Sequence, residues 1–146
     1  MKLGTVWKRS ICRSSDYPKF GEKKGICLPD LLHEEEPLFS GFVRYENQFE
    51  GKVGETYVLE ISDAYEGVEV FVNGRSLGIQ IVPTYRFDLS SEIQDGVNEL
   101  VIEVATTLER EASQFPNPYA KYIGQDVTPT CKSGISGTVK IYKNEK

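Results

Sequence analysis

The stretch GVEVFVNGRSLGIQIV, residues 67–82, decides the fold of this chain. Hydrophobic residues alternate with other residues on both sides of Asn73-Gly74, and both turn residues tolerate the positive φ of a two-residue type I′ turn. The stretch therefore predicts a β-hairpin with strands Gly67–Val72 and Ser76–Val82. Three residues of the second strand are expected to share one face: Leu77, Ile79 and Ile81.

The same period of two continues on both sides of the hairpin, in short β-branched runs separated by Gly, Asn, Asp and Pro. The further expected strands are Thr5–Cys12, Gly41–Phe49, Glu55–Ser62, Arg86–Leu89, Asn98–Thr106 and Gly137–Tyr142. Ile26–Leu32 is expected to form a short strand or a turn, and Ser90–Ile93 a capped helical turn. The pattern predicts an all-β antiparallel sandwich of about eight or nine strands.

Length, composition and charge bound the class of protein. A chain of 146 residues that is 39% hydrophobic and 27% charged is ordinary for one soluble globular domain. We therefore expect a single domain over residues 1–146. The net charge of −5 argues against nucleic acid as a partner, because proteins that bind it concentrate Lys and Arg.

Cysteine, histidine and hydropathy patterns argue against further classes. Cys12, Cys27 and Cys131 form no CxxC pair and His33 is the one histidine, so a zinc site is not expected. The odd number of cysteines favours reduced thiols, with one bridge plus a free thiol as the alternative. No signal-like or membrane-spanning apolar run is present, so we expect a cytoplasmic chain or a segment of a larger protein, with no membrane partner.

Three blocks carry a resemblance to a known family: FSGFVRYENQF (Phe39–Phe49), DAYEGVEVFVNGRSLG (Asp63–Gly78) and VPTYRFDLSSEIQDGVNELVIEVATT (Val82–Thr107). Together they resemble the sugar-binding domain of family 2 glycoside hydrolases and terminal domains of related large enzymes such as rhamnosidases. The resemblance is clearest over residues 39–142. It implies a galactose-binding-like jelly roll that acts as a non-catalytic carbohydrate-binding or accessory module, with a carbohydrate or a neighbouring catalytic domain as partner.

Catalytic chemistry is not expected in this chain alone. His33 precedes three glutamates, Glu34–Glu36, in an acidic connector, and the sequence has no nucleophile elbow, P-loop or dinucleotide motif. With 22 acidic residues, some carboxylate pair will lie at a separation suited to glycoside hydrolysis by chance. The resemblance implies that the catalytic acids lie in a separate barrel domain. A hydrolase component that is active only with such a domain is the alternative.

A sugar site needs polar side chains for the hydroxyl groups and aromatic rings for the apolar C–H faces. In jelly rolls of the resembled kind the site lies on loops at one end of the sandwich. The long connection Leu108–Ser136 is the best such loop, because connections above roughly 12 to 15 residues usually carry function or are disordered. The ligand-binding candidates are Tyr65, Tyr85, Arg86, Tyr119 and Tyr122.

Each candidate also has a structural alternative, because a tyrosine ring can pack while its hydroxyl reaches water. Trp7 is expected in the core. A structural calcium would suit the hard oxygens of Asp63, Glu66 and Asp88, although their spacing does not require it, and no other cofactor is expected. The competing function is a structural or protein-interaction sandwich without a ligand.

Overall fold

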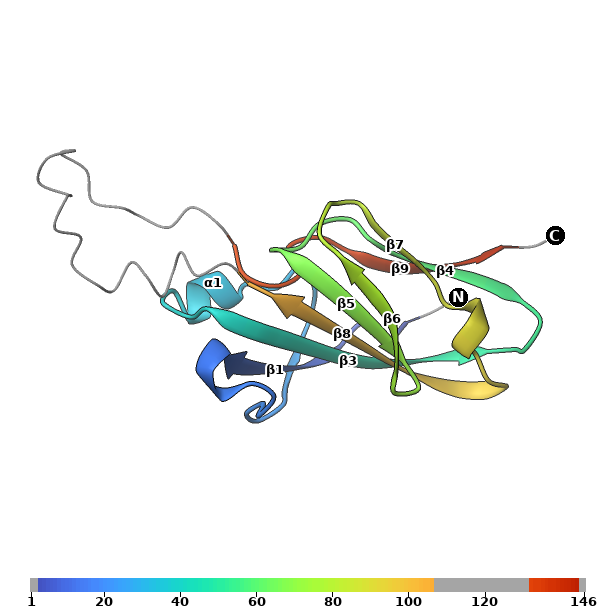
Figure 1. Cartoon of the computed structure of the whole chain (residues 1–146), viewed down its shortest axis with the longest axis horizontal. Helices are drawn as coiled ribbons and strands as arrows, with labels where there is room; N and C mark the ends of the chain where they lie inside the picture. The colour runs from blue at the N-terminus through green and yellow to red at the C-terminus, as the bar shows by residue number, and fades with distance from the viewer. Residues whose placement is uncertain (1–2, 107–131, 145–146) are drawn as a thin grey trace, which may run out of the picture.

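Two antiparallel sheets pack face to face in the structure, a computed structural model that describes residues 3–106 and 132–144 (Figure 1). The larger sheet has six strands in the order β2-β1-β3-β8-β5-β6, and the smaller has three in the order β7-β4-β9. The predicted all-β sandwich is confirmed. The strands within the described residues are β1 Trp7–Arg13, β2 Lys24–Ile26, β3 Gly41–Gly51, β4 Thr56–Ile61, β5 Gly67–Val72, β6 Arg75–Gln80, β7 Tyr85–Asp88, β8 Gly96–Ala105 and β9 Val139–Asn144.

Short helical turns connect some of these strands: η1 Ser14–Asp16, α1 Leu32–Glu35 and η2 Ser90–Glu92. The last of these confirms the helical turn expected at Ser90–Ile93. The segment Ile26–Leu32, expected as a short strand or a turn, bends at Leu28-Pro29 between the end of β2 at Ile26 and the start of α1 at Leu32. Leu32 is fully buried, so one apolar side chain holds this otherwise acidic turn against the core.

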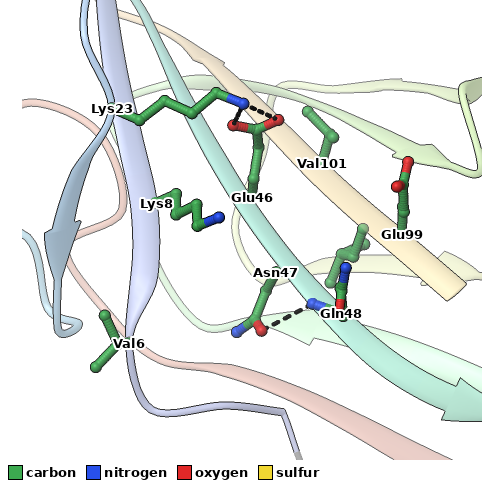
Figure 2. Close-up of a pocket in the computed structure, with 9 residues that line it drawn as sticks. Val6, Lys8, Lys23, Glu46, Asn47, Gln48, Glu99 and Val101 are labelled. Carbon is green, nitrogen blue, oxygen red and sulfur yellow. Dashed lines mark hydrogen bonds and ion pairs between the residues drawn. The ribbon is translucent and has the colours of Figure 1, made fainter. Parts of the chain in front are cut away.

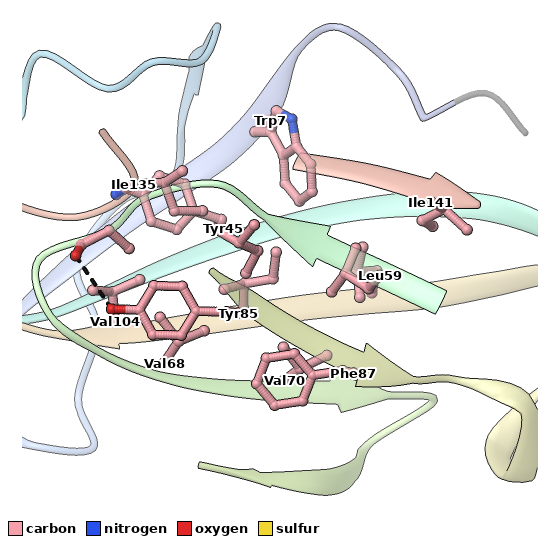
Figure 3. Packing of buried hydrophobic residues seen from close by; sticks show 14 of the residues in the cluster. Trp7, Tyr45, Leu59, Val68, Val70, Tyr85, Phe87, Val104, Ile135 and Ile141 are labelled. Atoms are coloured by element: carbon pink, nitrogen blue, oxygen red, sulfur yellow. Dashed lines mark hydrogen bonds between the residues drawn. The ribbon is translucent and has the colours of Figure 1, made fainter. Parts of the chain in front are cut away.

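Alternation along each strand builds the core between the two sheets. Val43 and Tyr45 of β3 and Leu59 of β4 point inward and are fully buried, as their period of two predicted. Figure 3 shows side chains from both sheets meeting in this layer, with Trp7 of β1 among them. The expectation that Trp7 is a core residue is confirmed.

The turn Asn73-Gly74 joins β5 to β6 as predicted, with φ of +52° and +83°. The second half of the hairpin differs. The register between β5 and β6 shifts between Glu69 and Phe71, and Gly78 on β6 has a φ of +102°, the conformation of a bulge. The extra residue reverses the alternation, so Leu77 packs against the core. Ile79 and Ile81 are exposed instead of sharing its face.

The thiols of Cys12 and Cys27 are both free, the first buried and the second exposed, and Cys131 lies outside the described residues. Burial raises the pKa of the Cys12 thiol. Among residues 3–106 and 132–144, no helix combines the length and the hydropathy that a membrane crossing requires.

Candidate functional site

The outward face of the larger sheet carries a mixed row of side chains across four strands. In antiparallel pairs, residues directly opposite each other project to the same face. Lys8 of β1 faces Glu46 of β3, Glu46 faces Val101 of β8, and Val101 faces Phe71 of β5. The row therefore runs from a cation through a carboxylate to an aliphatic and an aromatic side chain.

A cavity of about 340 Å³ lies over the first part of this row (Figure 2). Its volume falls within the roughly 300–1,000 Å³ of small-molecule sites. The residues that line it are Val6, Lys8, Lys23, Glu46, Asn47, Gln48, Glu99, Leu100 and Val101. We call it the outer-face cavity.

Several polar groups of the outer-face cavity are available to a ligand. Lys23 Nζ lies 3.0 Å from Glu46 Oε2, so these two charges compensate each other. Within the described part of the chain, the Lys8 ammonium, the Gln48 amide and the Glu99 carboxylate have no side-chain partner. One cation, one amide and one carboxylate thus border the same hollow, as Figure 2 shows.

This arrangement suits a ring with several hydroxyl groups. A sugar hydroxyl both donates and accepts, so it can use the Glu99 carboxylate, the Gln48 amide and the Lys8 ammonium. The apolar C–H face of the sugar can lie against Val101, beside Phe71 on the next strand. The cavity thus offers polar groups for sugar hydroxyls, whereas the apolar part of its described lining is aliphatic and the nearest aromatic ring of this row, Phe71, lies beside it.

Tyr85, one of the predicted ligand residues, lies in the core at 1% exposure. Its hydroxyl donates to the backbone carbonyls of Ala64, at 3.3 Å, and Glu66, at 2.5 Å, so it holds the segment before β5 (Figure 3). Burial raises the pKa of this hydroxyl, with Asp63 and Glu66 adding to the effect. Its ring has no face open to a ligand.

The other predicted ligand residues do not come together in one site. Tyr65 is half-buried and its backbone N–H donates to the Gly134 carbonyl at 2.8 Å. It lies close to Tyr85, whose hydroxyl bonds the carbonyls of the residues on either side of it. Arg86 is exposed on the opposite face of β7 and pairs with Glu60 at 3.2 Å. Tyr119 and Tyr122 lie outside the described residues.

The three carboxylates suggested for calcium are not brought together. Asp63 and Glu66 lie near the Tyr85 hydroxyl at one end of β7, while Asp88 lies at the other end, roughly 10 Å away along the strand. The Asp88 carboxylate accepts from the Ser90 N–H at 2.9 Å, and its hydrogen bonds with Ser90 lower its pKa. In residues 3–106 and 132–144, no group of three His, Cys, Asp or Glu side chains has a metal-binding arrangement.

A buried polar network at one end of the sandwich was missed by the sequence analysis. Arg9, at 5% exposure, donates to Asp30 Oδ1 at 2.5 Å and to Glu35 Oε2 at 2.6 Å. The Tyr45 hydroxyl donates to Asp30 Oδ2 at 2.5 Å and accepts from the Ile135 N–H at 3.0 Å. Glu35 is therefore not simply part of a solvated acidic run. The network joins β1, α1 and β3 to the segment that precedes β9.

Comparison with known proteins finds likeness in structure alone. No protein-family model matches the sequence, and no curated protein matches it. A rhamnosidase from Novosphingobium sp. PP1Y superposes with a TM-score of 0.75 at 21% identity, over 97% of this chain and 15% of that one. A GH2 β-galacturonidase from Eisenbergiella tayi gives a TM-score of 0.63 at 20% identity, over 97% of this chain and 24% of the other.

A third structure, an FMN-binding β-glucuronidase from Facaelibacterium prausnitzii L2-6, gives a TM-score of 0.60 at 21% identity. It aligns with 92% of this chain and 20% of its own. The chain thus spans less than a quarter of the length of each of these proteins. The predicted likeness to domains of family 2-type glycoside hydrolases and rhamnosidases is confirmed at the level of the fold.

Proposed function

We propose that this chain is a non-catalytic carbohydrate-binding accessory module of a glycoside hydrolase-like protein. The observation that carries the proposal is the outer-face cavity, where Lys8, Gln48 and Glu99 present free polar groups beside Val101. The structural likeness to part of three much longer glycoside hydrolases supports it. The sugar-contacting groups are therefore assigned to the sheet face and not to Tyr85 or Arg86.

The same cavity does not support hydrolysis by this chain alone. Most glycosidases use two carboxyl groups, one on either side of the scissile bond, as acid and as base or nucleophile. Of the two carboxylates in the cavity, Glu46 is held by Lys23 at 3.0 Å and only Glu99 is free of a side-chain partner in the described residues. One free carboxylate can bind a hydroxyl group but does not supply both the acid and the base.

Calorimetric titration of the purified chain tests the proposal. The ligands are galactose, rhamnose, glucuronate and galacturonate, each as monosaccharide and as oligosaccharide. We expect at least one to bind with millimolar affinity, about −4 kcal/mol. Glu99→Gln should weaken this binding, while Glu34→Gln, which removes an exposed carboxylate on α1 outside the cavity, should not.

A parallel assay with aryl glycosides of the same sugars addresses catalysis. We expect no turnover above the uncatalysed rate. Turnover that Glu99→Gln abolishes would show that the chain is an enzyme. Absence of binding to every sugar, with the chain folded, would remove the carbohydrate-binding part of the proposal.

A further inference from the structure

A second surface lies on the same sheet, at the β6 edge, and it is apolar. Ile79, Ile81 and Val82 are exposed at 67%, 74% and 67%. They follow one another along the end strand of the six-stranded sheet and its exit (Figure 1). Isolated exposed apolar residues are ordinary, but a contiguous group of them marks an interaction surface.

Small residues beside this edge leave a hollow in the sheet face. Ala105 of β8 lies directly opposite both Phe42 of β3 and Gly67 of β5. Tyr17 packs on Phe42, with 4.3 Å between ring centroids, and forms one wall. Ile79 forms the other wall, with Ile81 next to Gly67, and the hollow measures about 80 Å³. We call it the Gly67–Ala105 trough.

The trough carries one more negative than positive charge. Glu69 and Glu103 lie directly opposite each other on β5 and β8, a like-charge pair that destabilises a sheet. Arg44 compensates only Glu103, through two hydrogen bonds of 3.0 and 2.6 Å. Glu69 accepts from the Ser76 hydroxyl at 2.6 Å. A second cation at Glu69 would neutralise the pair.

The charge of Glu103, with burial and Glu69 adding to the effect, raises the pKa of the Tyr17 hydroxyl. The Tyr17 hydroxyl is thus close enough to Glu103 to feel its charge, so it also lies at the charged end of the trough. The trough thus combines an apolar floor and walls with a negative end, complementary to an alkyl chain that ends in an ammonium group.

We propose that the Gly67–Ala105 trough receives a lysine side chain from a protein partner, with the alkyl stem over Gly67 and Ala105 and the ammonium group at Glu69. The exposed Ile81, Val82 and Pro83 extend the contact beyond one side chain, which only a macromolecule can cover. Ile81 and Val82 are branched aliphatic side chains, whose shapes favour a protein surface over the flat stacking that a sugar prefers. This inference does not depend on the outer-face cavity.

Two peptides test the trough on the full chain, labelled with ¹⁵N and with ¹³C at Ile and Ala methyl groups. The first is Ac-Thr-Val-Lys-Val-Thr-NH₂ and the second carries norleucine in place of lysine. We expect the lysine peptide to shift the methyl signals of Ile79, Ile81 and Ala105 and to bind about fivefold more tightly than the norleucine peptide. Glu69→Gln should remove this difference, because a glutamine side chain keeps the shape of glutamate but not its charge.

A second variant closes the trough without relying on charge. A Cβ at Gly67 would lie 3.9 Å from the Ala105 Cβ and 4.0 Å from the Ile81 Cγ2, both ordinary contacts, so Gly67→Val should fold. It should abolish binding of both peptides, while Glu50→Gln, distant on β3, should leave binding unchanged. The proposal would be overturned if the two peptides bound equally well, or if neither shifted these methyl signals. It would also be overturned if glucosamine shifted these signals at a lower concentration than the lysine peptide.

Discussion

Lys8 and Glu46 lie directly opposite each other on β1 and β3, yet the carboxylate of Glu46 is paired with Lys23, 3.0 Å away. Within the described residues this leaves the Lys8 ammonium without an ion-pair partner at the rim of the outer-face cavity. A cation that the fold positions but does not compensate is a ready donor for a ligand oxygen.

The first prediction concerns this lysine. Lys8→Met keeps most of the side-chain volume and removes the donor, so the affinity for the best sugar should fall about fivefold to tenfold. Lys52→Met, at an exposed position after β3, should leave it unchanged. Calorimetric titration measures both. Equal affinity in the two variants would exclude Lys8 as a ligand contact.

The second prediction concerns the buried network. Tyr45→Phe removes the hydroxyl that donates to Asp30 and accepts from the Ile135 N–H, leaving a buried carboxylate oxygen and a buried N–H without this partner. We expect the free energy of unfolding in urea to fall by about 2–4 kcal/mol. Tyr142→Phe, at 47% exposure, is the control and should change little. A loss below that of the control would show that the network does not stabilise the fold.

A third prediction compares two glycines to distinguish the steric clash of an added Cβ from the backbone strain of a positive φ. Gly134 and Gly54 both have positive φ, +75° and +92°, so alanine is strained at either position. A Cβ at Gly134 would lie on the Tyr45 hydroxyl, whereas one at Gly54 has no atom within 4 Å. Thermal unfolding should therefore show a much larger loss of Tm for Gly134→Ala than for Gly54→Ala. Equal losses would mean that strain alone accounts for both.

The fourth prediction is a pH dependence. The hydrogen bond from Arg9 lowers the pKa of Glu35, so the folded pKa lies below the unfolded one. Such a group stabilises the fold above the unfolded pKa, and this contribution is lost as the pH falls through the folded pKa. Stability measured in urea should decline below about pH 5, and Glu35→Gln should decline less steeply. Parallel declines in both proteins would contradict this role.

The strands could be predicted because the alternation of hydrophobic residues within each strand shows which of its faces is buried. Val68, Val70 and Val72 alternate with other residues, and nothing outside the strand is needed to recognise the pattern. The same reasoning failed at Ile79 because a bulge depends on how two strands pair. Gly78 was the available signal, since an isolated glycine within a strand often marks a bulge.

The candidate site was harder to predict, because its residues are neighbours only through strand register. Lys8, Gln48 and Glu99 belong to three strands and carry no common motif. Tyrosines on loops were favoured instead, and Tyr85 is in fact a core residue. The network around Asp30 could not be predicted for a similar reason. Arg9 is a charged residue in β1, and a charged residue is expected at the surface unless its buried partners are known.

The most direct test of the account is to map a sugar titration onto the backbone amides of the labelled wild-type chain by NMR. The ligand is the sugar that binds best by calorimetry. The account predicts that the largest saturable shifts fall on Lys8, Gln48, Glu99 and Val101 around the outer-face cavity. Shifts confined to other parts of the chain, or no saturable shift at millimolar sugar, would contradict it.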